Sequence, residues 1–390
     1  MTKCVVLGVT GGIAAYKSAQ VVSDLKKKGY EVHVIMTKNA CEFITPLTFE
    51  TLSNNRVSVD TFDRNFEYSV NHISLAKKAD LFVIAPCSAN VIGKIANGIA
   101  DDMLTTTFLA STCPKLICPA MNTNMLENPI TKDNIAKCQK YGMHILDAAS
   151  GYLACGDSGK GRLASIDTIV NACEMLINNP KKVNKKILIS TGATKEYLDP
   201  IRYITNPSSG KTGRELAKVA YNYGMDVTLV TGENDFEDIP FIKTIKCKSA
   251  HDMFVNIDAL KDDMDIIIMS AAIADFTPKS KADNKIKKDG NGLTLELQPT
   301  VDILKHLGAH KKDGQILIGY AMETIDLINN AKAKLVKKNC DYIIANTISS
   351  NNQGFRSDEN IVTIISKDQV VELDKLTKSE IAKRIIELCI

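Results

Sequence analysis

The sequence has little that would place the protein in a membrane or on a nucleic acid. Its net charge is only +3 over 390 residues, which is too small to indicate either partner. No apolar run approaches the roughly 18–20 residues that a membrane-spanning helix needs. The first residues read as a strand and do not have the layout of a signal peptide. We therefore expect an ordinary globular protein.

The chain has eleven cysteines, but their spacing is not that of a metal site or a disulfide framework. No Cys-x-x-Cys pair occurs, which argues against structural zinc. Their number is odd, and they lie in apolar segments such as ICPA and VNACEML. This pattern predicts reduced thiols in a cytoplasmic protein.

Two common nucleotide-binding fingerprints are also missing. The turn GVTGGIAAYK, residues 8–17, lacks the Gly-x-Gly-x-x-Gly spacing, and NPSSGKTG, residues 206–213, is preceded by Thr205 where a P-loop needs glycine. Both turns nevertheless lead from an apolar strand toward a helix, a layout at which α/β proteins bind phosphate. The same strand–turn–helix layout therefore occurs in each half of the chain, and it predicts two nucleotide sites.

Apolar runs alternate with helical patterns along both halves, which predicts two different doubly wound parallel α/β domains. In the first half we expect strands at 5–9, 31–36, 81–85, 116–119 and 144–146, and helices at 14–28 and 167–178. In the second half we expect strands at 187–191, 226–230, 265–270, 315–320 and 342–345, helices at 212–223, 251–261, 325–338 and 378–388, and a hairpin of 361–366 with 370–373. The polar stretch NNPKKVNKK predicts domains at 1–178 and 186–390 joined by a linker at 179–185.

Polar groups follow two of the expected strands at their carboxyl ends, where doubly wound sheets bind ligands. Ser88, Ala89 and Asn90 follow one strand, and Asn122 follows another. Such hydroxyl and amide groups can bind a phosphate or the edge of a flavin. The alternatives are a helix cap for Ser88 and a turn for Asn122.

Three further segments carry candidate groups. His72 is a lone histidine, a type more often found capping or on the surface, and Cys155 lies in a Gly-rich loop long enough to be a mobile flap. A thiol on such a loop is a candidate acid or nucleophile, and an inert buried cysteine is the alternative. Asp275 precedes a loop with lysines at 279, 281, 285, 287 and 288. A carboxylate beside lysines suits a polyphosphate with Mg²⁺, and a solvated charged surface is the alternative.

Together these segments resemble the bifunctional family that joins phosphopantothenoylcysteine decarboxylase to phosphopantothenate–cysteine ligase in coenzyme A biosynthesis. Behind GGIAAYK and PCSAN, the decarboxylase motifs occur in order: His72, the PAMN around Asn122 and the LACG around Cys155. The second half matches through DPIRYITNPSSGKTG, SAAIADF, KIKK and GYAMET. The resemblance covers essentially the whole chain. One departure is Leu126, where family members usually carry an aromatic residue.

For the first half, the resemblance implies a flavodoxin-like domain that binds FMN and decarboxylates phosphopantothenoylcysteine to 4'-phosphopantetheine. FMN would oxidise the thiol side to a thioaldehyde, so that the carboxylate leaves beside an electron sink, and would then return the electrons. His72 would assist as a base, Asn122 would hold the carboxylate, and Cys155 would deliver a proton in the final reduction. The implied FMN-binding residues are Gly11, Gly12, Ser18, Thr37, Ser88, Ala89, Asn90 and Thr106.

For the second half, the resemblance implies a Rossmann-like ligase domain in which CTP activates phosphopantothenate as an acyl-cytidylate that cysteine attacks. Lys285 would neutralise phosphate charge. Asn206 would bind the acyl intermediate, Arg202 would support the substrate, and Asp275 would bind the nucleotide or Mg²⁺. The implied CTP-binding residues are Ala271, Asp275, Lys285, Val301, Asp302, Ile303, Leu304, Tyr320, Lys334 and Lys338.

The resemblance also implies an assembly. Flavoprotein domains would form trimers and ligase domains dimers, combined in a cytoplasmic dodecamer, with His72 serving a flavin of the next subunit. Two other functions stay open from the residues. One is an FMN reductase or prenyltransferase fused to an unrelated nucleotide-binding domain. The other is a flavoprotein that binds a phosphopeptide or a regulator and has lost catalysis.

Overall fold

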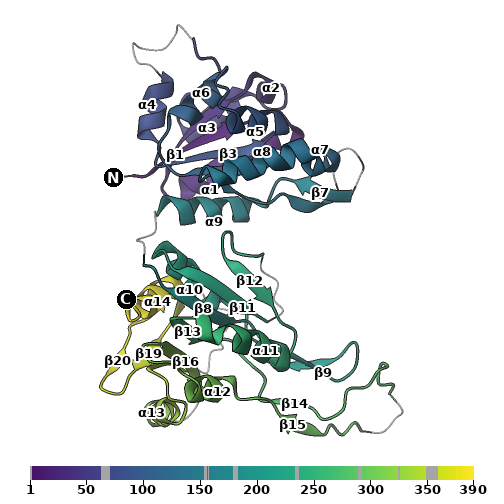
Figure 1. The fold of residues 1–390 in the computed structure, drawn as a ribbon, viewed down its shortest axis with the longest axis vertical. Helices are drawn as coiled ribbons and strands as arrows, with labels where there is room; N and C mark the ends of the chain where they lie inside the picture. Colours follow the sequence, from purple (N-terminus) through teal and green to yellow (C-terminus); the bar gives the residue numbers. More distant parts are fainter. Residues whose placement is uncertain are drawn as a thin grey trace. The chain divides into compact units, whose positions relative to one another are not determined.

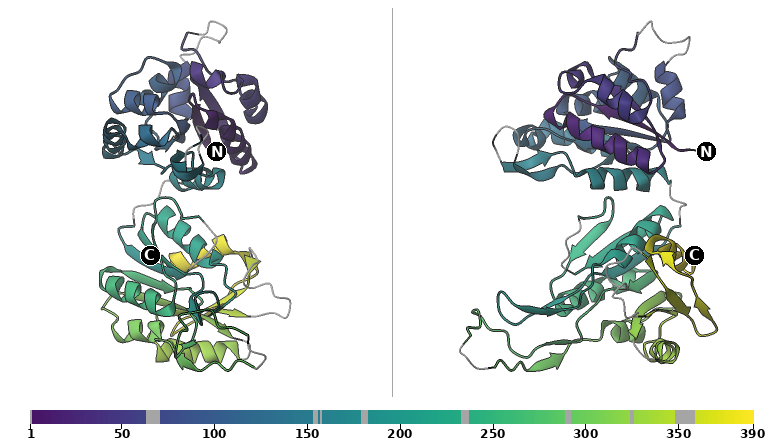
Figure 2. Two further views of the ribbon diagram at one scale, coloured as in Figure 1. Left: turned by 90° about the vertical axis from the view of Figure 1, so that its right-hand side faces the viewer. Right: turned by 180° about the vertical axis from the view of Figure 1, so that it is seen from behind.

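The chain folds into two compact units, which we call unit 1 (Met1–Asn179) and unit 2 (Pro180–Ile390). The computed structural model describes residues 2–62, 71–152, 156, 158–178, 183–232, 237–288, 292–323, 326–347 and 359–390. Each unit is built on a central sheet with helices on both faces (Figures 1 and 2). No helix in these ranges is long and apolar enough to cross a membrane.

Unit 1 has a five-stranded parallel sheet in the order β2-β1-β3-β4-β5. The strands are β1 (Cys4–Val9), β2 (Glu31–Met36), β3 (Leu81–Cys87), β4 (Lys115–Pro119) and β5 (His144–Ile145). This is the strand order of flavodoxin-like folds, the fold that the family resemblance implied for this half. Every residue of β1 and β3 is buried, which explains their continuous apolar sequences.

Helices cover both faces of this sheet. The helical segments are η1 (Ile13–Tyr16), α1 (Lys17–Lys27), α2 (Lys38–Cys41), α3 (Pro46–Ser53), α4 (Asn71–Lys78), α5 (Ala89–Ala96), α6 (Met103–Ala110), α7 (Thr123–Glu127), α8 (Pro129–Lys140) and α9 (Ile166–Ile177). On one face, α5 and α6 pack on β3, where the rings of Phe82 and Phe108 meet edge to face at 5.1 Å. An antiparallel pair, β6 (Ala149–Tyr152) and β7 (Ser158–Arg162), lies outside the main sheet.

Unit 2 has an eight-stranded sheet in the order β12-β11-β8-β13-β16-β17-β19-β20. Its strands are β8 (Lys186–Thr191), β11 (Asp226–Thr231), β12 (Lys243–Lys246), β13 (Ile266–Met269), β16 (Ile316–Glu323), β17 (Tyr342–Thr347), β19 (Val362–Ile365) and β20 (Val370–Glu372). The first six are parallel and follow the dinucleotide-fold order 3-2-1-4-5-6. The last two form the antiparallel hairpin that the sequence predicted.

The helices of unit 2 also pack on both faces of its sheet. They are α10 (Lys211–Asn222), α11 (Ala250–Leu260), η2 (Lys261–Asp263), α12 (Ile303–Ala309), α13 (Leu327–Lys337) and α14 (Lys378–Glu387). Helices α11, α12 and α13 share one core cluster, and α10 and α14 pack against each other. The short strands are β9 (Lys195–Tyr197) with β10 (Tyr203–Thr205), β14 (Phe276–Pro278) with β15 (Leu297–Pro299), and β18 (Glu359–Asn360) with β21 (Leu376–Thr377). The β14–β15 pair forms an arm that projects from the body of unit 2 (Figure 1).

Candidate active sites in the two units

Unit 1 contains a cavity of about 1220 Å³ at the carboxyl edge of its sheet. The loops that follow β1, β2, β3 and β4 line it, which is where a doubly wound sheet binds its ligands. Ordinary small-molecule pockets measure roughly 300–1,000 Å³. The cavity can therefore hold a cofactor together with part of a substrate.

Six of the eight expected FMN-binding residues line this cavity: Gly11, Gly12, Thr37, Ser88, Ala89 and Asn90. Asn122 lines it too. The other two, Ser18 and Thr106, are not among the described residues that line it. The buried Ser18 hydroxyl donates a hydrogen bond to the carbonyl of Ala85 at 2.6 Å. The Thr106 hydroxyl donates to the carbonyl of Ala100 at 3.4 Å.

The cavity floor is held by contacts between the loops. The Thr10 hydroxyl donates to the carbonyl of Pro86 at 2.8 Å and accepts the N–H of Ser88 at 2.9 Å. A Cβ at Gly11 would lie 2.6 Å from the Cβ of Asn39, closer than real Cβ atoms approach. Glycine at position 11 therefore allows the loop after β1 to pass directly against α2.

Ser88 and Asn122 each have a structural role as a helix N-cap, in addition to their place at the cavity. The Ser88 hydroxyl accepts the N–H of Val91 at 3.4 Å as the N-cap of α5. The Asn122 Oδ1 accepts the N–H of Asn124 at 2.8 Å as the N-cap of α7. Both nevertheless line the cavity. A helix-capping role and a place at the cavity wall are thus compatible, because both helices begin at the carboxyl edge of the sheet.

The remaining candidates of unit 1 lie in different places. His72 lies half-buried in α4 and is not among the described residues lining the cavity. Cys155 lies outside the described residues, but Tyr152 before it and Arg162 after it both line the cavity. Leu126, where relatives usually carry an aromatic residue, is buried in α7. Its neighbour Met125 lines the cavity, and Leu126 does not.

Sequence reasoning missed several charged residues at the cavity wall. The Lys94 ammonium contacts Asp101 at 2.7 Å and Asp102 at 3.2 Å, and its hydrogen bonds to these carboxylates raise its pKa. Asp102 also caps α6 through the N–H of Thr105. The spacing of Asp102 and Thr105 is a recognisable cap signal, but it does not show that the cap borders a cavity. Arg162 was missed as well.

In unit 2, several expected residues lie at the carboxyl edge where strand order reverses between β8 and β13, the point at which this fold binds ligands. The Asn206 amide Nδ2 donates to the carbonyls of Ala272 and Ile273, each at 3.3 Å. The N–H of Ala271 donates to the Ser190 hydroxyl at 3.2 Å. Asn206 and Ala271, 65 positions apart in sequence, therefore lie in directly bonded segments.

A buried carboxylate organises the segment beside Lys285. The two oxygens of Asp199 accept the N–H of Arg202 at 2.8 Å and the N–H of Ile286 at 3.1 Å. The guanidinium of Arg202 donates to Asp199 at 3.0 Å and to the carbonyl of Ile286 at 2.8 Å. Burial opposes ionisation of Asp199, but hydrogen bonds from the backbone N–H groups of Arg202, Ile201 and Ile286 outweigh it and lower its pKa. Lys285 itself is exposed.

A second group of expected residues gathers at the start of α12. Lys338 forms an ion pair with Asp302, the N-cap of α12, and the Lys334 ammonium donates to the carbonyl of Tyr320 at 2.9 Å. Burial opposes ionisation of Asp302, but Lys338 and the N–H of Lys305 outweigh it and lower its pKa. The two lysines thus lie beside one carboxylate.

The other residues expected around the nucleotide differ in exposure. Val301 is exposed, whereas Ile303 and Leu304 are buried in the core below α12. Burial raises the pKa of Tyr320, whose hydroxyl has no hydrogen-bond partner among the described residues.

Asp275 follows β13 and is bonded to the segment that leads to α12. Its side chain is exposed, and its backbone carbonyl accepts the N–H of Thr300 at 2.9 Å. The Thr300 hydroxyl donates to the carbonyl of Ala274 at 2.7 Å. These bonds join the segment after β13 to the residue before Val301.

Comparison with known proteins gives one consistent result for both units. The Flavoprotein family model matches residues 1–178, and the model of the DNA/pantothenate metabolism flavoprotein C-terminal domain matches residues 183–390. The coenzyme A biosynthesis bifunctional protein CoaBC of Bacillus subtilis (strain 168) is 45% identical over 388 residues, which cover 98% of this chain and 95% of that protein. The protein of the same name from Borreliella burgdorferi is 43% identical over 389 residues, covering 99% and 98%.

One solved structure is also similar to part of this chain. The C-terminal domain of a coenzyme A biosynthesis bifunctional protein CoaBC is 38% identical, with a TM-score of 0.46, and the match covers 53% of this chain and 95% of that one. The full-length relatives and the two family models together span both units. The chain therefore belongs to the family of coenzyme A biosynthesis bifunctional proteins.

Proposed function

We propose that unit 1 carries the decarboxylase and unit 2 the ligase of this bifunctional enzyme of coenzyme A biosynthesis. The flavoprotein model matches residues 1–178, and the pantothenate-metabolism model matches 183–390. The observation that carries the proposal is the cavity of unit 1, whose wall combines Gly11, Ser88, Asn90 and Asn122 at the carboxyl edge of a flavodoxin-like sheet. A decarboxylase that uses FMN needs both a flavin pocket and a carboxylate-binding group in one place.

The residues at this wall fit FMN. The Gly-rich turn at Gly11 and Gly12 leads into η1, and Ser88 and Asn90 offer hydroxyl and amide groups at the start of α5. When bound, FMN supplies the oxidation of the thiol side of the substrate and the later return of two electrons. The protein binds the cofactor and keeps it beside the substrate. For Ser18 and Thr106, which do not line the cavity, a role in FMN binding stays a sequence prediction.

In the decarboxylase, Asn122 binds the leaving carboxylate. Its Oδ1 accepts the N–H of Asn124, which orients the amide plane, and the Nδ2 of an amide can donate a hydrogen bond to a carboxylate. His72 assists as a base, since an imidazole nitrogen can accept a proton from the substrate. Cys155 delivers a proton in the final reduction.

In the ligase, the carboxylate of 4'-phosphopantothenate attacks the α-phosphate of CTP and releases pyrophosphate. The amine of cysteine then displaces CMP from the acyl-cytidylate. Negative charge at the phosphates is the main obstacle, and positioned cations lower it. Lys285, Lys334 and Lys338 supply these cations together with Mg²⁺ held at Asp275, and Asn206 with Arg202 positions the acyl group.

The pairing of Asp302 with Lys338 supports this arrangement. It keeps an ammonium group at the start of α12 before the nucleotide binds. Lys334 lies beside the same carboxylate, as its lowering effect on the pKa of Asp302 indicates. Val301 is exposed next to this pair and is available to contact the nucleotide. The buried Ile303 and Leu304 support the turn from within the core.

We assign the enzyme to a cytoplasmic homo-oligomer, with trimers of unit 1, dimers of unit 2 and a dodecamer as the closed assembly. Ile13, Tyr16, Met125 and Tyr152 line the cavity and are between 50% and 71% exposed, so the cavity mouth has an uncovered apolar rim. A neighbouring copy would cover that rim and bring its own His72 to the flavin.

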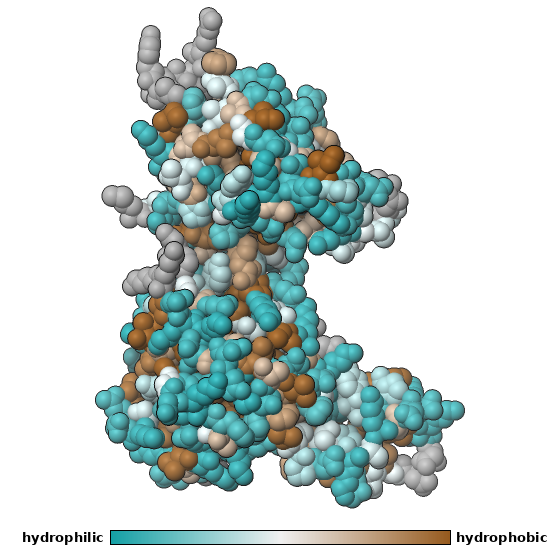
Figure 3. Space-filling model, viewed as in Figure 1, coloured by the Kyte–Doolittle hydropathy of each residue, from teal (hydrophilic) through white to brown (hydrophobic). Residues whose placement is uncertain are grey.

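On the arm of unit 2, Leu293, Leu295 and Leu297 are exposed at every second position, and apolar side chains are visible among polar ones there (Figure 3).

The division of labour is tested by two assays on the full chain. Phosphopantothenoylcysteine alone should release CO₂, and phosphopantothenate with cysteine and CTP–Mg²⁺ should release CMP. Asn122→Leu should lose CO₂ release and keep CMP release, and Lys285→Gln should do the reverse. Loss of CMP release in Asn122→Leu, in a protein that remains folded, would contradict the assignment of the two reactions to separate units.

A further inference from the structure

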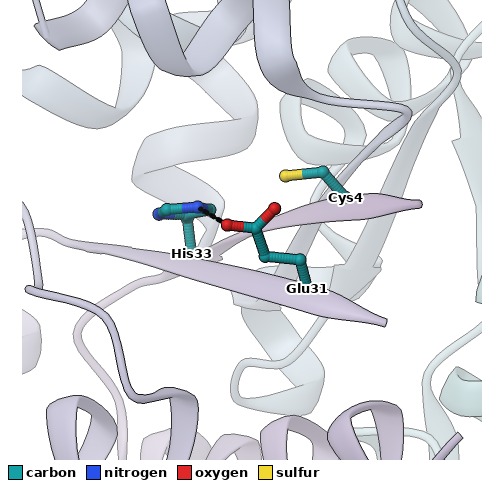
Figure 4. A group of neighbouring side chains, drawn as sticks. All are labelled: Cys4, Glu31 and His33. Carbon is teal, nitrogen blue, oxygen red and sulfur yellow. Dashed lines mark hydrogen bonds and ion pairs between the residues drawn. The ribbon is translucent and has the colours of Figure 1, made fainter. Parts of the chain in front are cut away.

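A second group of reactive side chains lies at the amino end of the unit 1 sheet, away from the loops that line the cavity. Cys4 begins β1 and is the register partner of Glu31, which begins β2, and His33 follows two residues later. Because side chains alternate along a strand, all three point to the same face. The thiol sulfur, a carboxylate oxygen and a ring nitrogen lie within 4.8 Å of one another (Figure 4).

We propose that Cys4, Glu31 and His33 bind one divalent transition-metal ion of the zinc type. Thiolate, imidazole and carboxylate are the ligands that zinc takes in proteins. Zinc bonds of about 2.0–2.3 Å place tetrahedral ligand atoms roughly 3.3–3.8 Å apart. The three ligand atoms lie up to 4.8 Å apart, and small rotations of the side chains bring them to the spacing that zinc requires. Figure 4 shows the Glu31 carboxylate between the other two groups, so one ion can reach all three.

The backbone under these ligands is firmly held. The N–H of Cys4 donates to the Asp80 carboxylate at 2.8 Å, and the N–H of Glu31 donates to the carbonyl of Lys3 at 2.9 Å. Cys4 is 2% exposed, whereas the Glu31 side chain is 32% exposed. An ion can therefore enter from the side of Glu31, and water can complete its coordination there.

Binding has to displace one cation and one proton. The Lys78 ammonium contacts Glu31 Oε1 at 2.6 Å, and His33 Nε2 contacts the same oxygen at 3.0 Å. The other oxygen of Glu31 lies on the side of the Cys4 sulfur (Figure 4). Burial raises the pKa of Cys4 to about 12, so the thiol releases its proton when the metal binds. Lys78 ends α4, the helix that carries His72, and metal binding removes this contact of that helix.

Cobalt(II) is a suitable probe, because a cobalt–thiolate bond absorbs in the near ultraviolet. We expect Co²⁺ to give this band with the full-length protein at one equivalent, and Zn²⁺ to remove it by competition. Cys4→Ser should abolish the band. His33→Gln changes the imidazole ligand and should weaken Co²⁺ binding at least about tenfold. The Co²⁺ affinity of His33→Gln tests the site in a protein that keeps the buried Cys4 thiol.

Two further variants serve as controls. Cys173→Ser replaces another fully buried cysteine of unit 1, in α9, and should leave the band unchanged. Lys78→Ala removes the competing ammonium and should tighten Co²⁺ binding several-fold. Circular dichroism checks that each variant is folded. Absence of the band from the wild-type protein, or its persistence in folded Cys4→Ser, would overturn the proposal.

Discussion

The carboxylate of Asp199 accepts a 3.1 Å hydrogen bond from the backbone N–H of Ile286, 87 positions further along the chain. Arg202 reinforces this link by donating to both residues. Ile286 directly follows Lys285, which we assign to charge neutralisation in the ligase. The position of the segment that carries the exposed Lys285 thus depends on a buried carboxylate far away in sequence.

We expect Asp199→Asn to impair ligation and to leave decarboxylation unchanged. The amide keeps the shape of the carboxylate, but its Nδ2 cannot accept the N–H groups that face it. Displacement of the Lys285 segment should lower the rate of CMP release roughly 10- to 100-fold. Steady-state assays of CMP and CO₂ release measure the two activities. Asp283→Asn is the matched control, because this exposed carboxylate of the same loop should not affect either rate.

The same residue predicts a dependence of stability on pH. The pKa of Asp199 is lowered below its ordinary value of 3.8. A carboxyl group with a lowered folded-state pKa stabilises the protein above its unfolded-state pKa, and this contribution is lost as the pH falls through the folded-state value. The difference in unfolding temperature between wild type and Asp199→Asn should therefore be smaller at about pH 3 than at about pH 7. Equal differences at both pH values, measured by calorimetry, would argue against an ionised Asp199.

We expect Asn206→Asp to accumulate the acyl-cytidylate. The Asn206 amide donates to two carbonyls at the carboxyl edge of β13, and a carboxylate cannot donate these bonds. The acyl group would then be formed but held poorly for attack by cysteine. Mass spectrometry of quenched reactions detects the intermediate. Asn256→Asp changes another half-buried amide that donates to a backbone carbonyl, and it should not accumulate the intermediate. Simple loss of CTP binding in Asn206→Asp would refute the role.

We expect Gly11→Ala to weaken FMN binding and to spare the ligase. The added Cβ would lie 2.6 Å from the Cβ of Asn39 and push the loop after β1 away from α2 at the cavity wall. Overpacking of this kind costs about 1–3 kcal/mol, which is roughly 5- to 150-fold in affinity if the cost falls on the FMN-bound form. Flavin fluorescence titration measures the affinity. Gly93→Ala in α5 is the control, because its Cβ would meet only one side-chain atom at 3.6 Å. Equal affinities for the two variants would contradict the proposed tight fit at Gly11.

We expect Cys155→Ser to release CO₂ but to stall before the final reduction. A serine hydroxyl is a much weaker acid than a thiol and cannot replace it as the proton donor. The oxidised enethiol product should therefore accumulate, and mass spectrometry identifies it. Cys113→Ser replaces a half-buried cysteine of unit 1 and should turn over normally. Normal release of phosphopantetheine by Cys155→Ser would end this assignment.

The main sheets could be predicted because their strands are marked in the sequence. In β1 and β3 every residue is buried, so the apolar runs are continuous and strand direction follows from the intervening helices. Strand direction in turn is enough to place Ser88 and Asn122 at the carboxyl edge of the sheet. The helix expected at 14–28 begins instead as the 3-10 turn η1, and α1 follows from Lys17.

The short strand pairs could not be predicted, because contacts distant in sequence determine them. The pair β6–β7 depends on Gly161, whose φ of +152° and lack of a Cβ let it pass against the carbonyl of Met121. Likewise, the segment joining β9 to β10 is held by Asp199 through Ile286. Arg162 lines the cavity from the β6–β7 hairpin, and Lys94 lines it from α5. Neither directly follows a strand of the main sheet, so strand direction could not predict their place at the cavity.

On the proposed function, one chain makes phosphopantothenoylcysteine in unit 2 and decarboxylates it in unit 1. The most direct test incubates the purified full-length protein with phosphopantothenate, cysteine and CTP–Mg²⁺ and follows CMP, CO₂ and phosphopantetheine by mass spectrometry. We expect all three products in equal amounts, and none when CTP is omitted. Formation of CMP without CO₂ and phosphopantetheine by a flavin-loaded protein would show that unit 1 is not the decarboxylase.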